Sequence, residues 1–180
     1  MGIIVSGITA VPDILKSRKI DAVLSIEHPN AQEGAGRVLR LENVPQEILC
    51  FWDIEKENFP DGPSDEIMQE AFAFLEVHKS QDVLIHCKAG KSRSVAIALA
   101  WEAHQTDIDS AVQFVKNHCE FPAPNLAMIQ IADRLFGFDG KFVDTVENDD
   151  IFTINREDAN QRRIEHLAKY SPEKLPPQPI

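Results

Sequence analysis

The nine residues 86–94, HCKAGKSRS, constrain this chain more than any other stretch. The apolar run at 83–85 before them is typical of a buried strand, and the apolar run at 95–100 after them is typical of a buried helix. A short loop between a strand end and a helix N-terminus presents several backbone N–H groups to one anion. The sequence therefore predicts a strand–loop–helix unit whose loop holds an anion beside a cysteine.

Four residues of this loop have a chemical reason to be there. Only a thiolate is a good nucleophile, and the helix N-terminus, the loop N–H groups and Arg93 all favour negative charge on the Cys87 sulfur. Arg93 also offers a planar fork of donors that matches two phosphate oxygens. Gly90 permits a positive φ or a close backbone approach. Ser94 places a hydroxyl where it can donate to the sulfur when the sulfur is the leaving group.

The remaining loop residues complete a predicted phosphate cradle. We expect the phosphate-binding positions to be Lys88, Ala89, Gly90, Lys91, Ser92 and Arg93. His86 is expected to fix the loop by hydrogen bonds rather than to transfer protons. A cysteine-dependent phosphatase needs a thiolate nucleophile together with groups that bind the phosphate.

The loop resembles the H-C-x-x-G-x-x-R-[ST] signature of the protein tyrosine and dual-specificity phosphatase superfamily. Pro124-Asn125 followed by Gln130 is similar to a P-N-x-x-x-x-Q element of dual-specificity phosphatases, and the compact layout resembles small bacterial tyrosine-phosphatase-like proteins. The resemblance covers about residues 3–138. It implies hydrolysis in two steps through a phosphocysteine, with no metal and no other cofactor.

The resemblance also implies a general acid on a loop upstream of the cysteine. Asp53 follows the strand-like run 48–52 and lies 34 residues before Cys87, a spacing similar to that of the family. Asp61 is the alternative, because residues 59–63 (FPDGP) resemble the Trp-Pro-Asp loop of larger tyrosine phosphatases. Its separation of 26 residues is short for that role, and Pro and Gly are equally typical of any turn. We therefore favour Asp53 and keep Asp61 open.

Composition limits the partners of such a site. The 180 residues carry a formal net charge of −11, which argues against nucleic acid and anionic membranes as partners. No stretch approaches the ~20 apolar residues of a membrane span. Three cysteines, one of them in the reactive loop, indicate a reducing compartment, so we predict a cytoplasmic protein. No histidine has metal-ligand spacing with a cysteine or an acid.

Strand-like and helix-like segments alternate along the chain. Strands are expected at 3–8, 20–26, 38–41 and 48–52, and helices at 11–18, 63–78, 94–104, 108–119 and 125–136. This pattern predicts an α/β fold, a central mixed β-sheet flanked by helices in a single-domain tyrosine-phosphatase-like sandwich. Residues 1–140 are expected to form the catalytic domain. Residues 141–180 are expected to form an acidic linker, a short helix near 156–170 and a Pro-rich C-terminal tail.

The substrate stays open at this stage. Phosphotyrosine or mixed phosphoprotein substrates are the first expectation. Lys88 and Lys91 resemble the loop of tensin-type phosphoinositide phosphatases and cysteine phytases, which makes inositol polyphosphates or phosphoinositides the alternative. A third possibility is a pseudophosphatase that binds a phosphorylated protein or small molecule without turnover. Cys50 is either a buried apolar residue or a partner for Cys87 in a protective disulfide.

Overall fold

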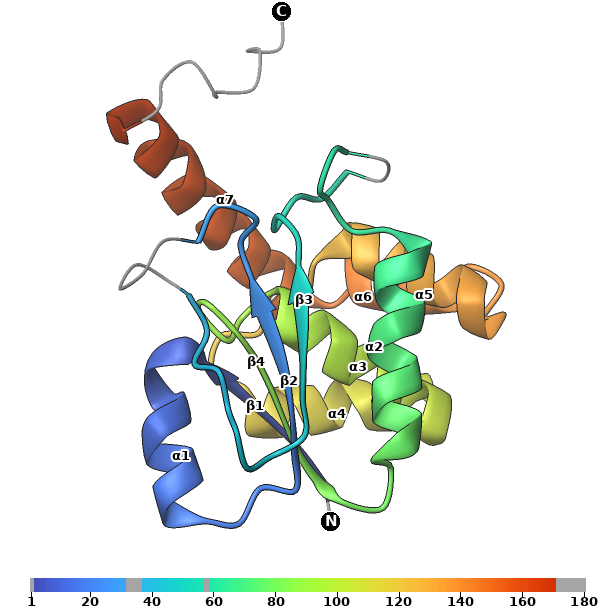
Figure 1. The fold of residues 1–180 in the computed structure, drawn as a ribbon. Helices are drawn as coiled ribbons and strands as arrows, with labels where there is room; N and C mark the ends of the chain where they lie inside the picture. Colours follow the sequence, from blue (N-terminus) through green and yellow to red (C-terminus); the bar gives the residue numbers. More distant parts are fainter. Residues whose placement is uncertain (1, 32–36, 57–58, 171–180) are drawn as a thin grey trace, which may run out of the picture.

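A four-stranded parallel sheet forms the centre of the molecule (Figure 1). The computed structural model describes residues 2–31, 37–56 and 59–170. The strands run in the order β1-β4-β2-β3 and have the bounds β1 (Gly2–Gly7), β2 (Ala22–Glu27), β3 (Gln46–Cys50) and β4 (Asp82–Cys87). Every pairing is parallel, so the carboxyl ends of all four strands lie at one edge of the sheet.

Helices cover both faces of this sheet. After the short 3-10 helix η1 (Ile8–Ala10), helix α1 (Val11–Ser17) covers one face, where Val11 packs with Ile20, Val23 and Leu84. On the other face lie α2 (Asp65–Val77), α3 (Arg93–Gln105), α4 (Ile108–His118) and α5 (Leu126–Phe136) (Figure 1). The predicted single-domain α/β sandwich is confirmed, with a parallel rather than mixed sheet, because the chain returns to the same end of the sheet before each strand.

Helix α3, which follows the loop at 86–94, is almost completely buried. All six residues of the apolar run 95–100 are 0% exposed. This burial on every side is possible because α3 lies between the sheet and the helices α4 and α5. A rigidly packed helix fixes the position of its own N-terminus, which is where the loop ends.

The strand predicted at 38–41 does not form. Side chains, rather than a neighbouring strand, bind the backbone of this segment: the carboxylate of Glu27 accepts from the N–H of Val38, and the amide of Gln46 bonds the N–H of Leu41 and the carbonyl of Leu39. Several of its polar backbone groups are thus hydrogen-bonded without a sheet ladder, so an apolar pattern alone was a poor guide here.

The acidic linker predicted after residue 140 is also helical. Helix α6 (Lys141–Glu147) and helix α7 (Asp150–Tyr170) follow one another. Phe142 and Val146, one helical turn apart, are both 0% exposed, as is Phe152 in α7, so these apolar residues hold the segment against the core. The predicted short helix therefore begins earlier than residue 156, and the predicted tail at 171–180 lies outside the described residues.

In the described part of the chain, no helix is both long enough and apolar enough to span a membrane.

Candidate active site

The loop with Cys87 lies where an anion site is expected in a parallel sheet. Strand β4 ends on Cys87 and α3 begins on Arg93, and β4 is flanked by β1 and β2. Ligands in such sheets bind beyond the carboxyl ends of the central strands. The positive end of the α3 dipole therefore faces the loop.

Gly90 fits the loop tightly against the end of β1. Its φ is +72°, and a Cβ there would lie 2.4 Å from the backbone nitrogen of Gly7 and from the carbonyl carbon of Ser6. The N–H of Ile8 donates to the carbonyl of Lys88 at 3.2 Å, which joins the same two segments. Only glycine satisfies both the positive φ and this close approach.

Two donors approach the sulfur of Cys87. The N–H of Gly90 donates to Sγ at 3.3 Å, and the hydroxyl oxygen of Ser94 lies 3.2 Å from it. Cys87 is only 2% exposed, so solvent screens these contacts poorly. The surroundings thus suit a negatively charged sulfur or a sulfur leaving group.

Arg93 is buried and its orientation is fixed by backbone carbonyls. Nη1 donates to the carbonyl of Glu27 at 3.1 Å and to the carbonyl of Phe51 at 2.7 Å. Nε makes no hydrogen bond within the described residues and lies 3.9 Å from Oδ2 of Asp53. A guanidinium held by one nitrogen keeps its Nε edge for a ligand, and the side chain is only 1% exposed.

Asp53 joins this loop, as the spacing argument favours. Its Oδ1 accepts from the hydroxyl of Ser92 at 2.8 Å and from Nδ2 of Asn125 at 2.9 Å. Asn125 is the N-cap residue of α5, where its own side-chain oxygen accepts from the N–H of Met128. Three segments far apart in sequence therefore meet at one carboxylate.

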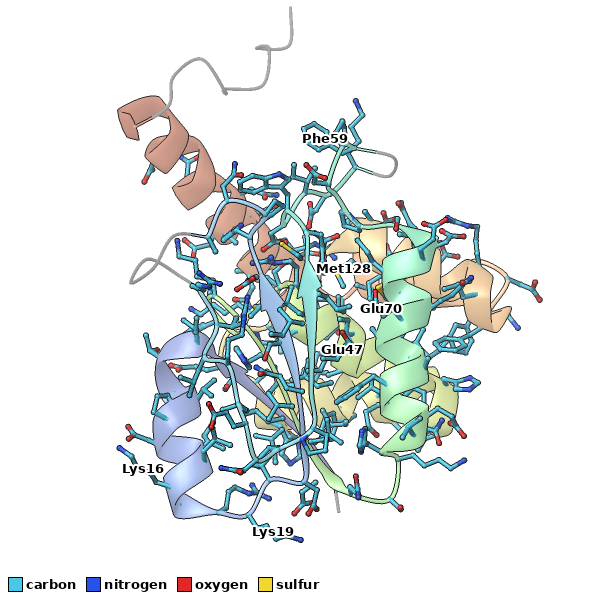
Figure 2. All side chains as sticks on the ribbon, in the orientation of Figure 1. Lys16, Lys19, Glu47, Phe59, Glu70 and Met128 are labelled. Carbon is cyan, nitrogen blue, oxygen red and sulfur yellow. The ribbon has the colours of Figure 1, made fainter. Side chains whose placement is uncertain are left out.

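Asp61 contacts the same region through its backbone instead. Its carbonyl accepts from the N–H of Trp52 at 2.7 Å, its φ is +54°, and its side chain is exposed. Figure 2 shows Phe59 of the same turn on the loop beyond the carboxyl end of β3, where 40% of it is exposed. The turn at 59–61 packs back on Trp52 but does not direct a carboxylate to the loop by any hydrogen bond between described residues.

The two loop lysines differ in their surroundings. The ammonium group of Lys91 lies 4.6 Å from the ring centroid of Phe121, which is 56% exposed and has a φ of +52°. Such a contact favours a cation over the aromatic face. Lys88 is exposed at the start of the loop.

Two histidines near the loop are neutral at pH 7. Burial lowers the pKa of His86 to about 4, and its Nε2 lies 2.8 Å from the hydroxyl of Ser25. Burial, followed by the charges of Arg93 and Lys88, lowers the pKa of His28 to about 4. His28 was missed by the sequence analysis, although its place just after a strand at the carboxyl edge is a usable signal. Its ring centroid lies 5.3 Å from that of Trp52.

The low pKa of His86 predicts a pH-dependent stability. Unfolding restores an ordinary pKa near 6.5, so the unfolded chain binds more protons between about pH 6.5 and pH 4. The free energy of unfolding is expected to fall as the pH is lowered through this window, by about 3 kcal/mol from His86 alone. His86→Gln should show a shallower fall when urea unfolding is followed across the window, and His118→Gln, an exposed position, is the control. An unchanged slope in His86→Gln would contradict this assignment.

The other two cysteines have different environments. Burial raises the pKa of Cys119 to about 12, so this thiol stays protonated. Cys50 is exposed on β3, and β2 lies between β3 and the strand of Cys87. Two strand spacings amount to roughly 9–10 Å, beyond the Cα separation that a disulfide spans. A Cys50–Cys87 disulfide therefore requires backbone movement.

Elsewhere the described residues hold no metal cluster, and two cavities lie away from the loop at 86–94. No group of three or more His, Cys, Asp or Glu side chains is gathered for a metal among the described residues. A cavity of about 760 Å³ lies near the C-terminal end of α3, lined among others by His104, Asp107 and Phe136. None of its lining residues belongs to the loop at 86–94, which leads into the opposite, N-terminal end of α3.

Curated proteins with similar sequences include two human phosphatases. The chain is 31% identical over 121 residues to dual specificity protein phosphatase 2 of Homo sapiens, covering 64% of this chain and 34% of that protein. It is 28% identical over 165 residues to dual specificity protein phosphatase 5 of Homo sapiens, covering 89% and 39%. The chain thus spans less than half the length of the curated relatives it matches. No family model matches it.

Solved structures share the fold at low identity. The human tyrosine phosphatase-like serine/threonine/tyrosine-interacting protein matches with a TM-score of 0.59 and 18% identity, over 76% of this chain and 92% of that chain. PTPMT1 in complex with PI(5)P matches with a TM-score of 0.55 and 12% identity, over 76% and 91%. At these identities the likeness concerns the fold alone.

Proposed function

The chain belongs to the cysteine-based protein tyrosine and dual-specificity phosphatase superfamily, and on this premise we propose that it hydrolyses phosphate monoesters through a phosphocysteine. The observation that carries the proposal is the meeting of three groups at one loop: the buried sulfur of Cys87, the Nε edge of Arg93, and the carboxyl of Asp53. The sulfur serves as the nucleophile, the guanidinium binds the phosphoryl oxygens, and the carboxyl group transfers protons.

In the first step the Cys87 thiolate attacks phosphorus, an S–P bond forms and the ester P–O bond breaks. The loop N–H groups and Arg93 bind the phosphoryl oxygens, whose negative charge is spread over them in the transition state. Asp53 gives its proton to the leaving oxygen, which departs as an alcohol or a phenol.

In the second step a water molecule attacks the phosphocysteine. The Asp53 carboxylate accepts a proton from that water, the S–P bond breaks, and inorganic phosphate forms. The sulfur leaves as a thiolate, and Ser94, 3.2 Å from Sγ, donates a hydrogen bond to it. The step regenerates both Cys87 and protonated Asp53.

Phosphotyrosine or mixed phosphoprotein substrates come first in the proposal. The curated relatives are named as protein phosphatases. Aromatic side chains also lie near the loop: the Trp52 ring is tilted against that of His28, and Phe121, which Lys91 contacts, is 56% exposed. A rim of this kind favours an aromatic phosphoester over a small aliphatic one.

A phosphoinositide or inositol polyphosphate is the second candidate. PTPMT1, which shares the fold, has been solved with PI(5)P. Two lysines in the loop favour a ligand with more than one phosphate. Because the ammonium group of Lys91 contacts Phe121, Lys88 is the loop lysine better placed to bind a further phosphate. We therefore rank this candidate second.

A pseudophosphatase is the remaining alternative, and one fold relative is named as a phosphatase-like interacting protein. The test is turnover of an aryl phosphate, measured beside binding of a tyrosine-phosphorylated peptide. Turnover supports the enzyme, whereas peptide binding with no turnover supports the binding module.

The general acid can be identified with two variants on two substrates. Asp53→Asn is expected to lower kcat about a hundredfold on phenyl phosphate, whose leaving oxygen is basic, and much less on nitrophenyl phosphate. It should also remove the alkaline limb of the pH–rate profile. Asp61→Asn should have a small effect that is equal on both substrates.

The reverse result would assign the acid to the turn at 59–61. Small, equal effects in both variants would remove the general acid and place the pseudophosphatase first.

We also propose where the protein is located and which residues form its catalytic domain. Cys87 must stay reduced to react, in keeping with the cytoplasmic location that we predict from the cysteine content. All the side chains assigned to chemistry lie within residues 1–140, which we propose as the catalytic domain. The buried Phe142, Val146 and Phe152 then stabilise this domain from outside its proposed boundary.

A further inference from the structure

The segment 38–41, which we name the strap, is connected to both ends of the loop at 86–94 through hydrogen bonds of intervening residues. It is not part of the sheet, and two side chains at the carboxyl and amino ends of neighbouring strands hold it: Glu27 at the end of β2 and Gln46 at the start of β3. Each of these side chains leads to a different end of the loop.

The first connection runs through Glu27 to Arg93. Both carboxylate oxygens of Glu27 accept from Arg40, at 2.8 and 3.1 Å, and one also accepts from the N–H of Val38 at 3.1 Å. The hydrogen bonds from Arg40 lower the pKa of Glu27. The carbonyl of the same Glu27 accepts from Nη1 of Arg93 at 3.1 Å. Glu27 therefore binds the strap with its side chain and the phosphate-binding arginine with its backbone.

The second connection runs through Gln46 to His86. Gln46 accepts from the N–H of Leu41 and donates to the carbonyl of Leu39 and to the hydroxyl of Ser25 at 2.9 Å. That hydroxyl lies 2.8 Å from Nε2 of His86, the residue before Cys87. The strap is thus connected to the two ends of the loop by separate routes, one through Glu27 and one through Gln46 and Ser25.

We propose that Glu27, held by Arg40 of the strap, is a positioning residue that fixes the orientation of Arg93 toward phosphate. The inference rests on the proposed function. The two Nη1 hydrogens of Arg93 go to the carbonyls of Glu27 and Phe51, so these two carbonyls define the plane of the guanidinium. A displacement of either one turns the Nε edge away from the phosphate, and bidentate recognition tolerates only small errors.

Arg40 is the better position for the test, because its side chain is 45% exposed and its loss removes little packing. Arg40→Met is expected to weaken the binding of inorganic phosphate, measured by calorimetry in the Cys87→Ser background, about five- to tenfold. With Cys87 intact, kcat/KM for an aryl phosphate should fall by at least the same factor. The pH–rate profile should keep its shape, because Asp53 is untouched.

Two further variants separate positioning from stability. Arg40→Lys keeps the charge and should recover most of the phosphate affinity, and Glu27→Gln should resemble Arg40→Met. Glu42→Gln, an exposed carboxylate just beyond the strap, is the matched control. Thermal unfolding of every variant shows whether a loss of affinity follows a loss of stability.

Parent-like phosphate affinity in both Arg40→Met and Glu27→Gln overturns this inference while the proposed function stands. A loss of affinity that tracks the melting temperature across all variants, with no recovery in Arg40→Lys, also overturns it. A parent protein that neither binds phosphate nor turns over an aryl phosphate overturns the proposed function and this inference together.

Discussion

Replacing Cys87 with serine is expected to reduce aryl phosphate turnover at least about a thousandfold while inorganic phosphate still binds. A hydroxyl does not become a nucleophilic anion at neutral pH, so no covalent intermediate forms. The rest of the cradle stays intact, because Arg93 is held by the carbonyls of Glu27 and Phe51 and not by the sulfur. Initial rates on nitrophenyl phosphate and a calorimetric phosphate titration measure the two quantities.

Cys50→Ser is the matched control, since it makes the same exchange at an exposed thiol. It should leave turnover at the level of the parent. Residual activity within tenfold of the parent in Cys87→Ser would show that Cys87 is not the nucleophile.

Replacing Arg93 with lysine is expected to lower kcat/KM several hundredfold and to weaken phosphate binding as well. Lysine keeps the positive charge but has a single ammonium group in place of the planar fork. It cannot bond the two carbonyls that hold Nη1 and also present an Nε edge to phosphate. Both kcat and KM should change, because the contact exists in the ground state and strengthens in the transition state.

Arg134→Lys makes the same exchange at a half-exposed arginine paired with Asp65 and serves as the control. Comparison of the melting temperatures shows whether the lysine variant is folded. A folded Arg93→Lys protein with the kinetics of the parent would mean that Arg93 has only a structural role.

Local sequence patterns predicted most helices and strands to within a few residues. The run at 95–100 became the buried part of α3, and the helices expected at 108–119 and 125–136 became α4 and α5. These segments are long and periodic, so their own side chains determine their conformation. The strand predicted at 38–41 was wrong. The side chains of Glu27 and Gln46 accept hydrogen bonds from backbone N–H groups of this segment, in place of a neighbouring strand.

Helix α6 and the first part of α7 were missed for a related reason, whereas the helix predicted near 156–170 lies within α7. Asp144 and its acidic neighbours suggested a solvated linker, but Phe142 and Val146 are buried against a core built by earlier elements. Burial of two apolar residues one turn apart depends on the surface they meet, and that surface is not visible in the segment itself.

The sequence by itself determined the chemistry of the loop: a thiol, a glycine, an arginine and a hydroxyl at fixed spacings between a strand and a helix. Only the tertiary structure decided what surrounds them. It brought Asp53 to Ser92 and Asn125, set Arg93 on the carbonyls of Glu27 and Phe51, and placed His28 beside the loop. Residues within a short loop are neighbours through covalent geometry. Asp53, Glu27, Phe51 and His28 reach the loop because parallel strands place their carboxyl ends at one edge of the sheet, and Asn125 reaches it from the N-terminus of α5.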